Sequence, residues 1–180
     1  TNLTPSYNKL ILSFDLTITN YKNIKNLLEN LTISKNIKKD SKKIEIPVCC
    51  EEEYGLDFKR LVKRLNTNKN EILKLYFDKE YFCYMTGFIA GMPFLGDLND
   101  NIRCDRLETP RVKVPKGSVG ITEQFANIYT FESPGGWNII GNTPMKIFDN
   151  ENLNQPALIN PGDRVNFYQI TKKEYLNWNE

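Results

Sequence analysis

The sequence predicts an α+β fold in two parts, an N-terminal α+β domain over residues 1–79 and an all-β domain over residues 80–180. Two observations lead to this prediction. Before residue 80, apolar residues recur at intervals typical of both strands and helices. Nine of the ten glycines and seven of the nine prolines lie beyond residue 86, where they disfavour helices and separate short β-favouring runs. Short strands with closely spaced turns are typical of a compact barrel or sandwich whose loops present a site.

In the first half, the expected order begins with strand, helix and strand. Residues 9–14 form an apolar run of strand length. The apolar residues within 20–31 fall on one face of a helix, which predicts an amphipathic helix there. A polar connection over 32–42 follows, and 43–48 alternates between apolar and polar residues, as a half-buried strand does.

Two further helices are predicted before residue 80. Asp57 is expected to cap a helix whose apolar residues lie between Phe58 and Leu65, and a second helix begins near Asn68. The three consecutive glutamates at 51–53 have the composition of a metal cluster. Because consecutive side chains point in different directions on any regular element, we interpret them as a solvated acidic turn.

The second half is expected to consist of short strands. Residues 81–88 form an aromatic-rich strand, which leads into a loop rich in glycine and proline at 87–98. The other runs predicted as strands are 112–114, 118–122, 127–131, 137–140, 145–148 and 163–170.

Composition excludes several functional classes. A net charge of +2 argues against a dedicated nucleic-acid binder. No apolar stretch approaches the ~18 residues of a membrane helix and no signal peptide is visible, so we expect a cytoplasmic protein without a membrane partner. The four cysteines match no zinc or redox spacing, and we expect them buried and reduced. With no histidine, the chain lacks a Ser-His-Asp triad and a His-ligated metal, and no metal site is predicted.

Eight short motifs occur in order along the chain: IPVC at 46–49, YGLD at 54–57, YMTGFIAGMPFLG at 84–96, TPR at 109–111, VPKGSVGI at 114–121, SPGGW at 133–137, IGNTP at 140–144 and PGDRV at 161–165. This combination resembles the B subunit of the bacterial ATP-dependent 5-oxoprolinases, a family also called allophanate hydrolase subunit 1 or Kip-type kinase inhibitor. The resemblance runs from about residue 5 to the end. It implies an N-terminal α/β sandwich, here partial and ferredoxin-like, followed by a cyclophilin-like β-barrel.

The activity that the resemblance implies is the opening of 5-oxo-L-proline to L-glutamate, driven by ATP. A lactam is a poor electrophile, and phosphorylation of its carbonyl oxygen supplies a good leaving group. The implied cofactor is ATP with Mg²⁺, shared with a partner protein. The implied partners are a homologue of the 5-oxoprolinase C subunit, in a heterodimer or heterotetramer, and a homologue of the A subunit. The chain has no Walker-type sequence, so ATP would be contacted by another device.

Arg111 heads the candidate catalytic residues. Together with Lys113 it forms a small cationic group suited to carboxylate or phosphate oxygens, although a solvated loop arginine would look the same. Gly117 and Ser118 could offer backbone N–H groups to an anion or simply begin a strand. Glu132 is the best carboxylate candidate for proton transfer. We therefore expect Arg111 and Glu132 to act in catalysis and the other three residues to bind substrate.

The turn at 133–137 is a second candidate for binding substrate. Ser133, Gly135 and Gly136 would form a backbone-lined rim, with Trp137 as an apolar wall. The alternative is that Trp137 is a barrel-core residue.

The aromatic loop near residue 90 is a third candidate, because Phe88, Gly91 and Phe94 suit a pocket lining or a partner-facing loop. Here the chain departs from the family, which usually reads GFxPGF; Ala90 and Met92 replace a proline and an aromatic residue.

A further departure puts catalytic competence in question. The family usually has Gly-x-Gln-Thr/Ser where this chain has Glu123, Gln124, Phe125 and Ala126, which removes a polar substrate contact. Two alternatives to a component of 5-oxoprolinase therefore stay open. One is a regulatory module that inhibits a histidine kinase, and the other is a carboxyltransferase component of a urea amidolyase-type system.

Overall fold

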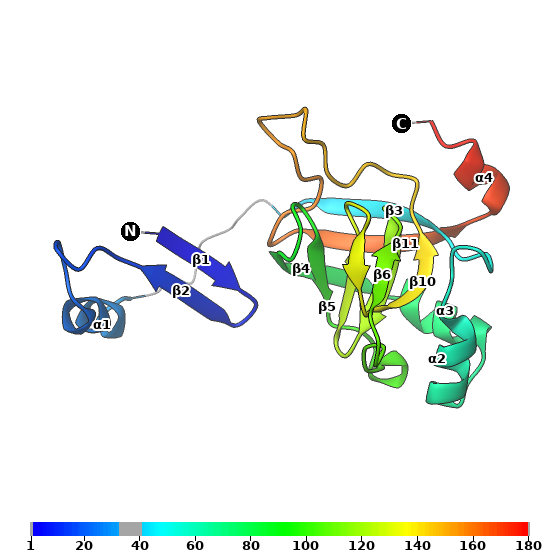
Figure 1. Ribbon diagram of the computed structural model, residues 1–180, viewed down its shortest axis with the longest axis horizontal. Coiled ribbons are helices and arrows are strands. Elements are labelled where there is room, and N and C mark those ends of the chain that lie inside the picture. Colours follow the sequence, from blue (N-terminus) through cyan, green and yellow to red (C-terminus); the bar gives the residue numbers. More distant parts are fainter. Residues whose placement is uncertain (1, 33–40, 180) are drawn as a thin grey trace. The chain divides into compact units, whose positions relative to one another are not determined.

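The structure is a computed structural model that describes residues 2–32 and 41–179. It divides the chain into two compact units, residues 1–40 and residues 41–180 (Figure 1). The predicted α+β class is confirmed, since helices accompany a closed seven-stranded barrel in the second unit. The grouping differs from the boundary predicted near residue 79, because 43–77 contributes a strand and two helices to the barrel unit.

The first unit contains a hairpin and one helix. Strands β1 (Asn2–Ser6) and β2 (Lys9–Ser13) pair antiparallel, and helix α1 (Tyr21–Glu29) follows. The Asn20 side chain caps that helix by accepting a hydrogen bond from the Asn23 N–H at 3.0 Å. Strand β2 and helix α1 match the predicted elements, whereas β1 was not predicted. Most of the predicted connection at 32–42 lies outside the described residues.

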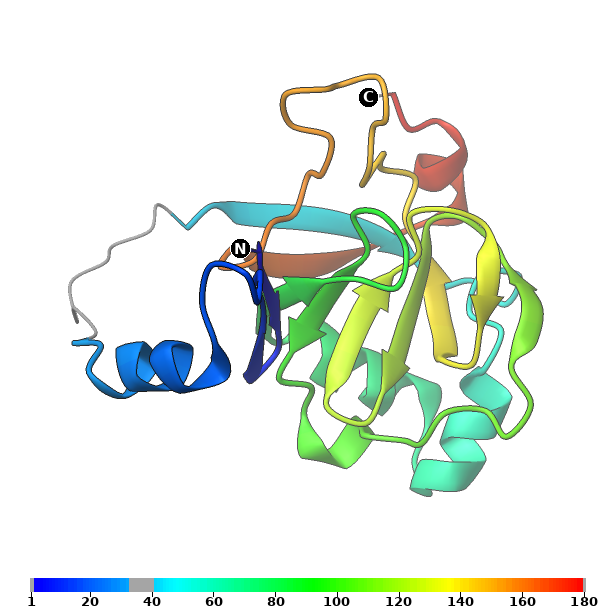
Figure 2. The ribbon, with the colours of Figure 1, turned by 60° about the vertical axis from the view of Figure 1, so that its left-hand side comes forward.

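The barrel closes in the strand order β10-β3-β11-β4-β5-β8-β7 (Figure 1). These strands are β3 (Lys43–Cys49), β4 (Glu80–Thr86), β5 (Pro93–Gly96), β7 (Ser118–Thr122), β8 (Phe125–Ile128), β10 (Asn138–Asn142) and β11 (Arg164–Ile170). Strands β3 and β11 run parallel and side by side in both ribbon views (Figure 2), in register from Lys43↔Arg164 to Cys49↔Ile170.

Apolar residues from alternate strand positions fill the barrel, and two helices pack on them. Helices α2 (Phe58–Leu65) and α3 (Lys69–Phe77) lie together beside one end of the barrel (Figure 2) and contribute Leu61, Ile72 and Tyr76 to the core. Both helices were predicted. The Asn68 side chain caps α3 by accepting from the Glu71 N–H.

Several elements differ from the predictions. The loop expected at 87–98 contains strand β5, and the strand expected at 127–131 begins two residues earlier, as β8. Residues 145–148 form no strand beyond the single bridge Phe148↔Ala157. The unpredicted elements are β9 (Ser133–Gly135), the 3-10 turn η1 (Asp100–Ile102) and helix α4 (Lys172–Leu176). These are too short for a periodic pattern to reveal them.

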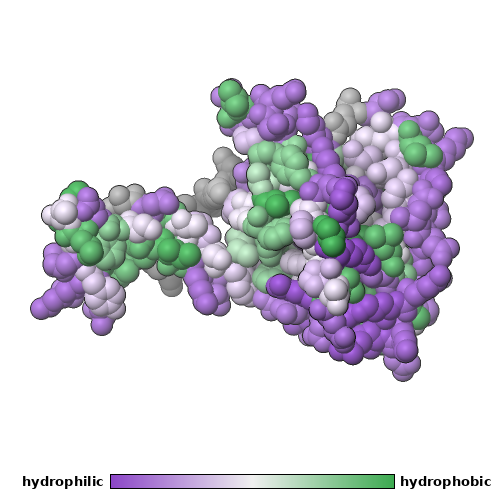
Figure 3. All heavy atoms as spheres, in the orientation of Figure 1, coloured by the Kyte–Doolittle hydropathy of each residue, from purple (hydrophilic) through white to green (hydrophobic). Residues whose placement is uncertain are grey.

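Surface hydropathy and the cysteines complete the description. Apolar atoms are visible on the first unit in the space-filling view (Figure 3), where Ile11, Ile18 and Leu27 are all more than half exposed. In the second unit the four cysteines are buried and free, as predicted, and burial raises the pKa of the Cys50 thiol to about 12. None of the helices within the described ranges has the length and apolar character to cross a bilayer.

Two buried tyrosines give a matched test of the barrel core. Tyr81 Oη donates to the carbonyl of Tyr76 at 2.9 Å, whereas Tyr76 Oη is buried without a hydrogen-bond partner among the described residues. We expect Tyr81→Phe to lower the free energy of unfolding by about 1 kcal/mol, and Tyr76→Phe to leave it unchanged or raise it. Urea unfolding of both variants checks this, and a larger loss in Tyr76→Phe would contradict it.

Candidate functional site

A two-stranded ribbon covers part of the outer face of the barrel. Strands β6 (Arg111–Val114) and β9 (Ser133–Gly135) pair antiparallel, with Arg111 opposite Gly135 and Val114 opposite Ser133. Val114 packs with Trp137 in a second apolar cluster, separate from the barrel core. The ribbon therefore forms an additional layer outside the barrel wall.

The alternation of side chains along β7 and β8 explains which residues of the barrel wall face the ribbon. On β8, Ala126 and Ile128 belong to the barrel core, so Phe125 and Asn127 face the other way. On the neighbouring β7, a Cβ at Gly120 would point at Asn127 Oδ1 and at Trp137. We name this layer the ribbon site, with the members Arg111, Asn127, Tyr129, Ser133, Gly135 and Trp137.

A buried carboxylate fixes Arg111. Arg111 Nη2 donates to Asp57 Oδ1 at 2.7 Å, and Asp57 is only 4% exposed. The second carboxylate oxygen accepts from the Ile139 N–H at 2.6 Å, and the Asp57 N–H donates to the Ile139 carbonyl. Asp57 stands at the start of α2, as predicted, but its side chain makes no capping bond. It instead joins that helix to β10 and to the ribbon.

The segment leading into β6 is also held in place. The Arg60 guanidinium donates to the Asn138 side chain, to the Asp105 carbonyl and to the Arg106 carbonyl. Asn138, which is fully buried, donates in turn to the Asp105 carbonyl at 3.0 Å. Because these bonds fix residues 105 and 106, the ribbon starts from a defined position.

Tyr129 lies against the ribbon where Gly135 has no side chain. A Cβ on Gly135 would lie 2.1 Å from Tyr129 Oη, so only glycine permits this approach. Burial raises the pKa of Tyr129, although hydrogen bonds with the Asn127 side chain and the Trp137 backbone oppose the shift. Tyr129 is therefore a neutral phenol at physiological pH.

Three polar atoms of the ribbon site are buried without a hydrogen-bond partner in the part of the chain that the structure describes. They are Arg111 Nη1, Asn127 Oδ1 and Ser133 Oγ. A buried polar atom left unpaired costs roughly 1–3 kcal/mol, and such atoms in a native protein call for an explanation such as a bound molecule. Their concentration in one layer marks the ribbon site as the candidate functional site.

The structure brings several of the predicted site residues together here. Arg111, Ser133 and Gly135 belong to the ribbon itself, and Trp137 packs edge to face on Phe94, with ring centroids 5.5 Å apart. Trp137 is therefore part of an apolar cluster outside the barrel core. The sequence analysis considered it either as an apolar wall of a substrate site or as a barrel-core residue, and neither description covers this position fully.

The other predicted residues lie elsewhere. Lys113 Nζ pairs with Glu132 Oε1 at 2.9 Å, but the two side chains are 74% and 56% exposed. An exposed ion pair of this kind contributes little to stability, and the Lys113–Glu132 pair faces solvent rather than the buried polar atoms. A Cβ added at Gly136 would make only ordinary contacts with Pro110.

The two remaining groups also fall outside the ribbon site. The Gly117 N–H donates to the Tyr129 carbonyl, and the Ser118 N–H donates to the Pro115 carbonyl, so neither is free for an anion. These residues begin strand β7, the structural alternative considered above.

The aromatic loop is divided between surface and packing. Phe88 is 68% exposed with a positive φ of 70°, and a Cβ on Gly91 would run into the Phe148 ring. Phe88 can thus face a partner, while Gly91 is required for packing.

Sequence reasoning missed two members of the ribbon site and one supporting role. Asn127 lies in an apolar run and Tyr129 follows it, so neither was singled out. Asp57 was interpreted as a helix cap. A period of two along β8 would have placed Phe125, Asn127 and Tyr129 on one face. Asn127 therefore supplies a carboxamide on the face where Phe125 replaces the glutamine of the family.

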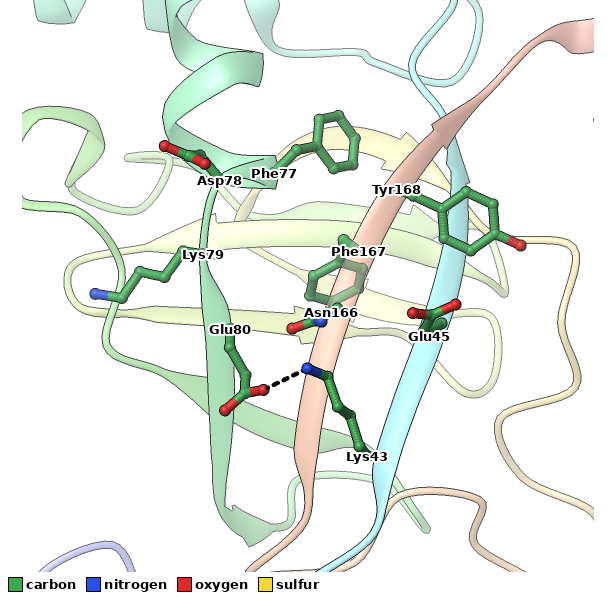
Figure 4. A pocket seen from close by; sticks show the side chains of 9 residues that line it. All are labelled: Lys43, Glu45, Phe77, Asp78, Lys79, Glu80, Asn166, Phe167 and Tyr168. Atoms are coloured by element: carbon green, nitrogen blue, oxygen red, sulfur yellow. Dashed lines mark ion pairs between the residues drawn. The ribbon is translucent and has the colours of Figure 1, made fainter.

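A separate pocket of about 460 Å³ lies on the outer surface of strands β3, β11 and β4 (Figure 4). Lys43 and Glu80 point toward one another across it and pair at 3.1 Å. It shares no lining residue with the ribbon site. Its charged residues are largely solvent-exposed, and we assign it no function.

Comparison with known families defines the class of protein to which this fold belongs. The family model described as carboxyltransferase domain, subdomain C and D, matches residues 1–159, and the chain belongs to this family.

Two curated relatives are each named as the B subunit of 5-oxoprolinase. The protein of Bacillus subtilis is 38% identical over 137 residues, covering 76% of this chain and 57% of the relative. The protein of Haemophilus influenzae is 44% identical over 124 residues, covering 69% of this chain and 58% of the relative. This chain thus spans a little under three fifths of either relative. The resemblance drawn from the motifs is confirmed.

Among solved structures, a conserved uncharacterized protein from Pyrococcus horikoshii, PH0987, superimposes with a TM-score of 0.71 at 33% identity. The match covers 97% of this chain and 81% of that protein. The fold therefore recurs in a relative over nearly the whole described chain.

Adjacent glycines allow a controlled test of the ribbon site. A methyl group at Gly135 would collide with the Tyr129 hydroxyl, whereas one at Gly136 meets Pro110 at 3.6 Å, an ordinary contact. We expect Gly135→Ala to lower the free energy of unfolding by about 1–3 kcal/mol, and Gly136→Ala to change it by less than about 0.5 kcal/mol. Denaturant unfolding measures both, and equal effects would show that Tyr129 does not lie against the ribbon.

Proposed function

We propose that this chain is part of the B subunit of an ATP-dependent 5-oxoprolinase, which opens 5-oxo-L-proline to L-glutamate. Membership of the family and the names of the two curated relatives support the reaction class. The site that we assign to this function contains Arg111. Its guanidinium donates a hydrogen bond to the buried Asp57 carboxylate, and its Nη1 is a buried donor without a partner among the described residues. The chain acts as a non-autonomous, cytoplasmic component.

The reaction requires activation of a lactam. The γ-phosphoryl group of ATP transfers to the lactam oxygen, which releases ADP, and water then attacks the activated carbon. The ring C–N bond then breaks and the ring nitrogen takes up a proton, which leaves an acyl phosphate of glutamate. A second water displaces phosphate from this acyl phosphate and gives the free carboxylate. Each step moves negative charge between oxygens, and a fixed guanidinium can stabilise such charge without reorganising.

The role of Arg111 follows from its surroundings. Asp57 occupies Nη2 and fixes the plane of the guanidinium, so Nη1 is directed by the fold rather than by solvent. The Arg111 side chain is 28% exposed, so its charge is only partly screened by water. We assign Arg111 to the anionic part of the substrate, and Asp57 to positioning it.

ATP and Mg²⁺ belong to the proposed assembly rather than to a pocket of this chain. No group of three or more Asp, Glu or Cys side chains that could hold a metal ion occurs within 2–32 and 41–179. Mg²⁺ commonly retains waters and is held through substrate phosphates with one or two carboxylates, so a partner protein can complete its site. The names of the relatives, which make each one part of a larger enzyme, support such partners, namely homologues of the A and C subunits.

A coupled assay tests the function. Mixed with homologues of the A and C subunits, the chain is expected to release glutamate from 5-oxoproline only when ATP is present. Arg111→Gln is expected to lower kcat/KM roughly 10- to 100-fold, because it removes a charged hydrogen bond to the substrate. Lys63→Gln, on the exposed face of α2, serves as the control and should stay within about twofold.

Two outcomes would contradict the proposal. ATP turnover that depends on urea and a biotinylated partner, without glutamate release, would favour the carboxyltransferase alternative. Full activity of Arg111→Gln, with thermal unfolding unchanged, would remove Arg111 from the site.

A further inference from the structure

A groove of about 490 Å³ lies beside the start of helix α2, and none of its lining residues belongs to the ribbon site. We name it the lysine groove, and its side-chain lining consists of Glu52, Leu56, Phe58, Lys59, Val62 and Lys69. We propose that the lysine groove binds a small aliphatic carboxylic acid, with the carboxylate between Lys59 and Lys69 and the apolar chain on Leu56 and Val62. This inference is independent of the proposed function.

The inner surface of the lysine groove is apolar. Phe58 belongs to the barrel core, and the half-buried Val62 packs against that core. Leu56 is 44% exposed, although it stands in the chain between the buried residues Gly55 and Asp57. An apolar chain placed in the groove would remove part of Leu56 from water together with its own methylene groups, which is favourable. A groove of this volume with an apolar surface and few charged groups is typical of small-molecule sites.

Lys69 is a cation that is held in a fixed position beside this apolar surface. Its Nζ donates to the Cys50 carbonyl at 2.7 Å and lies 4.6 Å from the centre of the Phe58 ring. An ammonium group has three donors, and the described part of the chain gives Lys69 one hydrogen-bond acceptor. A ligand carboxylate can therefore bind Lys69 without displacing its contact with Cys50.

Lys59 supplies a second cation, whose present partner is weakly held. Lys59 Nζ pairs with Glu52 Oε1 at 3.2 Å, and the two side chains are 93% and 87% exposed. A pair this exposed contributes little to stability, so a ligand carboxylate can replace Glu52. The neighbouring Glu53 pairs with Lys172 at 2.7 Å, and Glu51 does not line the groove. Two lysines against one glutamate favour an anionic ligand.

The backbone around the groove favours a free acid over a peptide. The N–H groups of Tyr54 and Gly55 both donate to the Glu51 carbonyl, and the Asp57 N–H donates to the Ile139 carbonyl. These three main-chain donors are therefore not available to the carbonyls of a bound peptide. Peptide groups left unpaired in an apolar groove are unfavourable, whereas a molecule with one charged head and an apolar body has none.

The lysine groove adjoins the segment that positions Arg111. Asp57, which accepts from Arg111 Nη2 at 2.7 Å, stands in the chain between Leu56 and Phe58, two residues of the groove. A ligand that contacts folded α2 and its preceding turn stabilises the folded state relative to the unfolded chain. Occupancy of the groove is therefore expected to raise the midpoint of thermal unfolding.

A ligand series tests the head and the chain of the acid separately. The full chain is titrated by calorimetry with octanoate, hexanoate, 1-octanol and octylammonium. We expect octanoate to bind roughly 4- to 15-fold more tightly than hexanoate, because two more methylene groups are buried. Replacing the carboxylate by a hydroxyl or an ammonium should weaken binding at least about fivefold, because neither group pairs with two lysines.

Matched variants locate the apolar chain. Leu56→Ser is expected to weaken octanoate binding roughly 5- to 20-fold, because the chain loses its main exposed apolar contact. Leu153→Ser, at a highly exposed leucine that does not line the groove, is the control and should stay within about twofold. Both leucines are exposed, so neither substitution removes a core side chain.

Charge variants locate the carboxylate. Lys69→Gln, whose amide can still donate to the Cys50 carbonyl, should weaken octanoate binding roughly 10-fold. Glu52→Gln should instead strengthen it by about two- to fivefold, because it removes the carboxylate that competes for Lys59. Lys63→Gln, on the same helix but outside the groove, is the control and should bind like the unmodified chain.

Two results would overturn the inference. Equal binding of octanoate to the unmodified chain and to Leu56→Ser would place the acid elsewhere. Tighter binding of octylammonium, or of a short peptide that ends in leucine, would contradict the assignment of a free acid. All these measurements report binding, so they do not depend on glutamate release. A chain that binds octanoate as expected but supports no turnover would overturn the proposed function and leave the lysine groove in place.

Discussion

The Asp57 carboxylate is the interaction on which the rest of the site depends. It is almost fully buried and is satisfied by the Ile139 N–H of the barrel and by the Arg111 guanidinium of the ribbon. A buried carboxylate is strongly destabilising when it loses a partner, so its two contacts constrain each other. Because Asp57 also begins helix α2, one side chain connects helix, barrel strand and ribbon. The orientation of Arg111 therefore follows from the barrel fold rather than from the ribbon alone.

Local patterns predicted much of the fold, and non-local pairing explains what they missed. The periodicities of 43–48 and 58–65, and the Pro161-Gly162 turn before 163–170, depend only on neighbouring residues, and the structure contains β3, α2 and β11 there. The parallel pairing of β3 with β11 joins residues about 120 positions apart, as in Lys43↔Arg164. Nothing in the alternation of 43–48 specifies that partner, which is why the predicted boundary at residue 79 separates this strand from the other strands of the barrel.

The site shows the same division between local and non-local information. Arg111 and the turn at Ser133–Gly135 were singled out from neighbouring residues alone, namely the lysine beside the arginine and the adjacent glycines of the turn. Asp57 was interpreted as a cap, since an aspartate before a helix is most often one. Asn127 was overlooked because its burial depends on a covering ribbon that no local pattern announces. Charge alone favoured Lys113 and Glu132, and these two residues satisfy each other at the surface.

The barrel wall explains how the protein can keep polar atoms unpaired next to its core. Strands β7 and β8 place four apolar residues inside the barrel, where they stabilise the fold: Val119, Ile121, Ala126 and Ile128. The outward-facing positions of the two strands are therefore not needed for packing the core. Those outer positions carry Gly120 and Asn127, a combination that contributes little packing of its own. Departures from local stability rules are expected where structure serves a function. Because alternate residues of β7 and β8 face opposite sides, a substitution on the ribbon side leaves the core residues unchanged. The composition of the ribbon site can therefore vary without a change in the residues that stabilise the barrel.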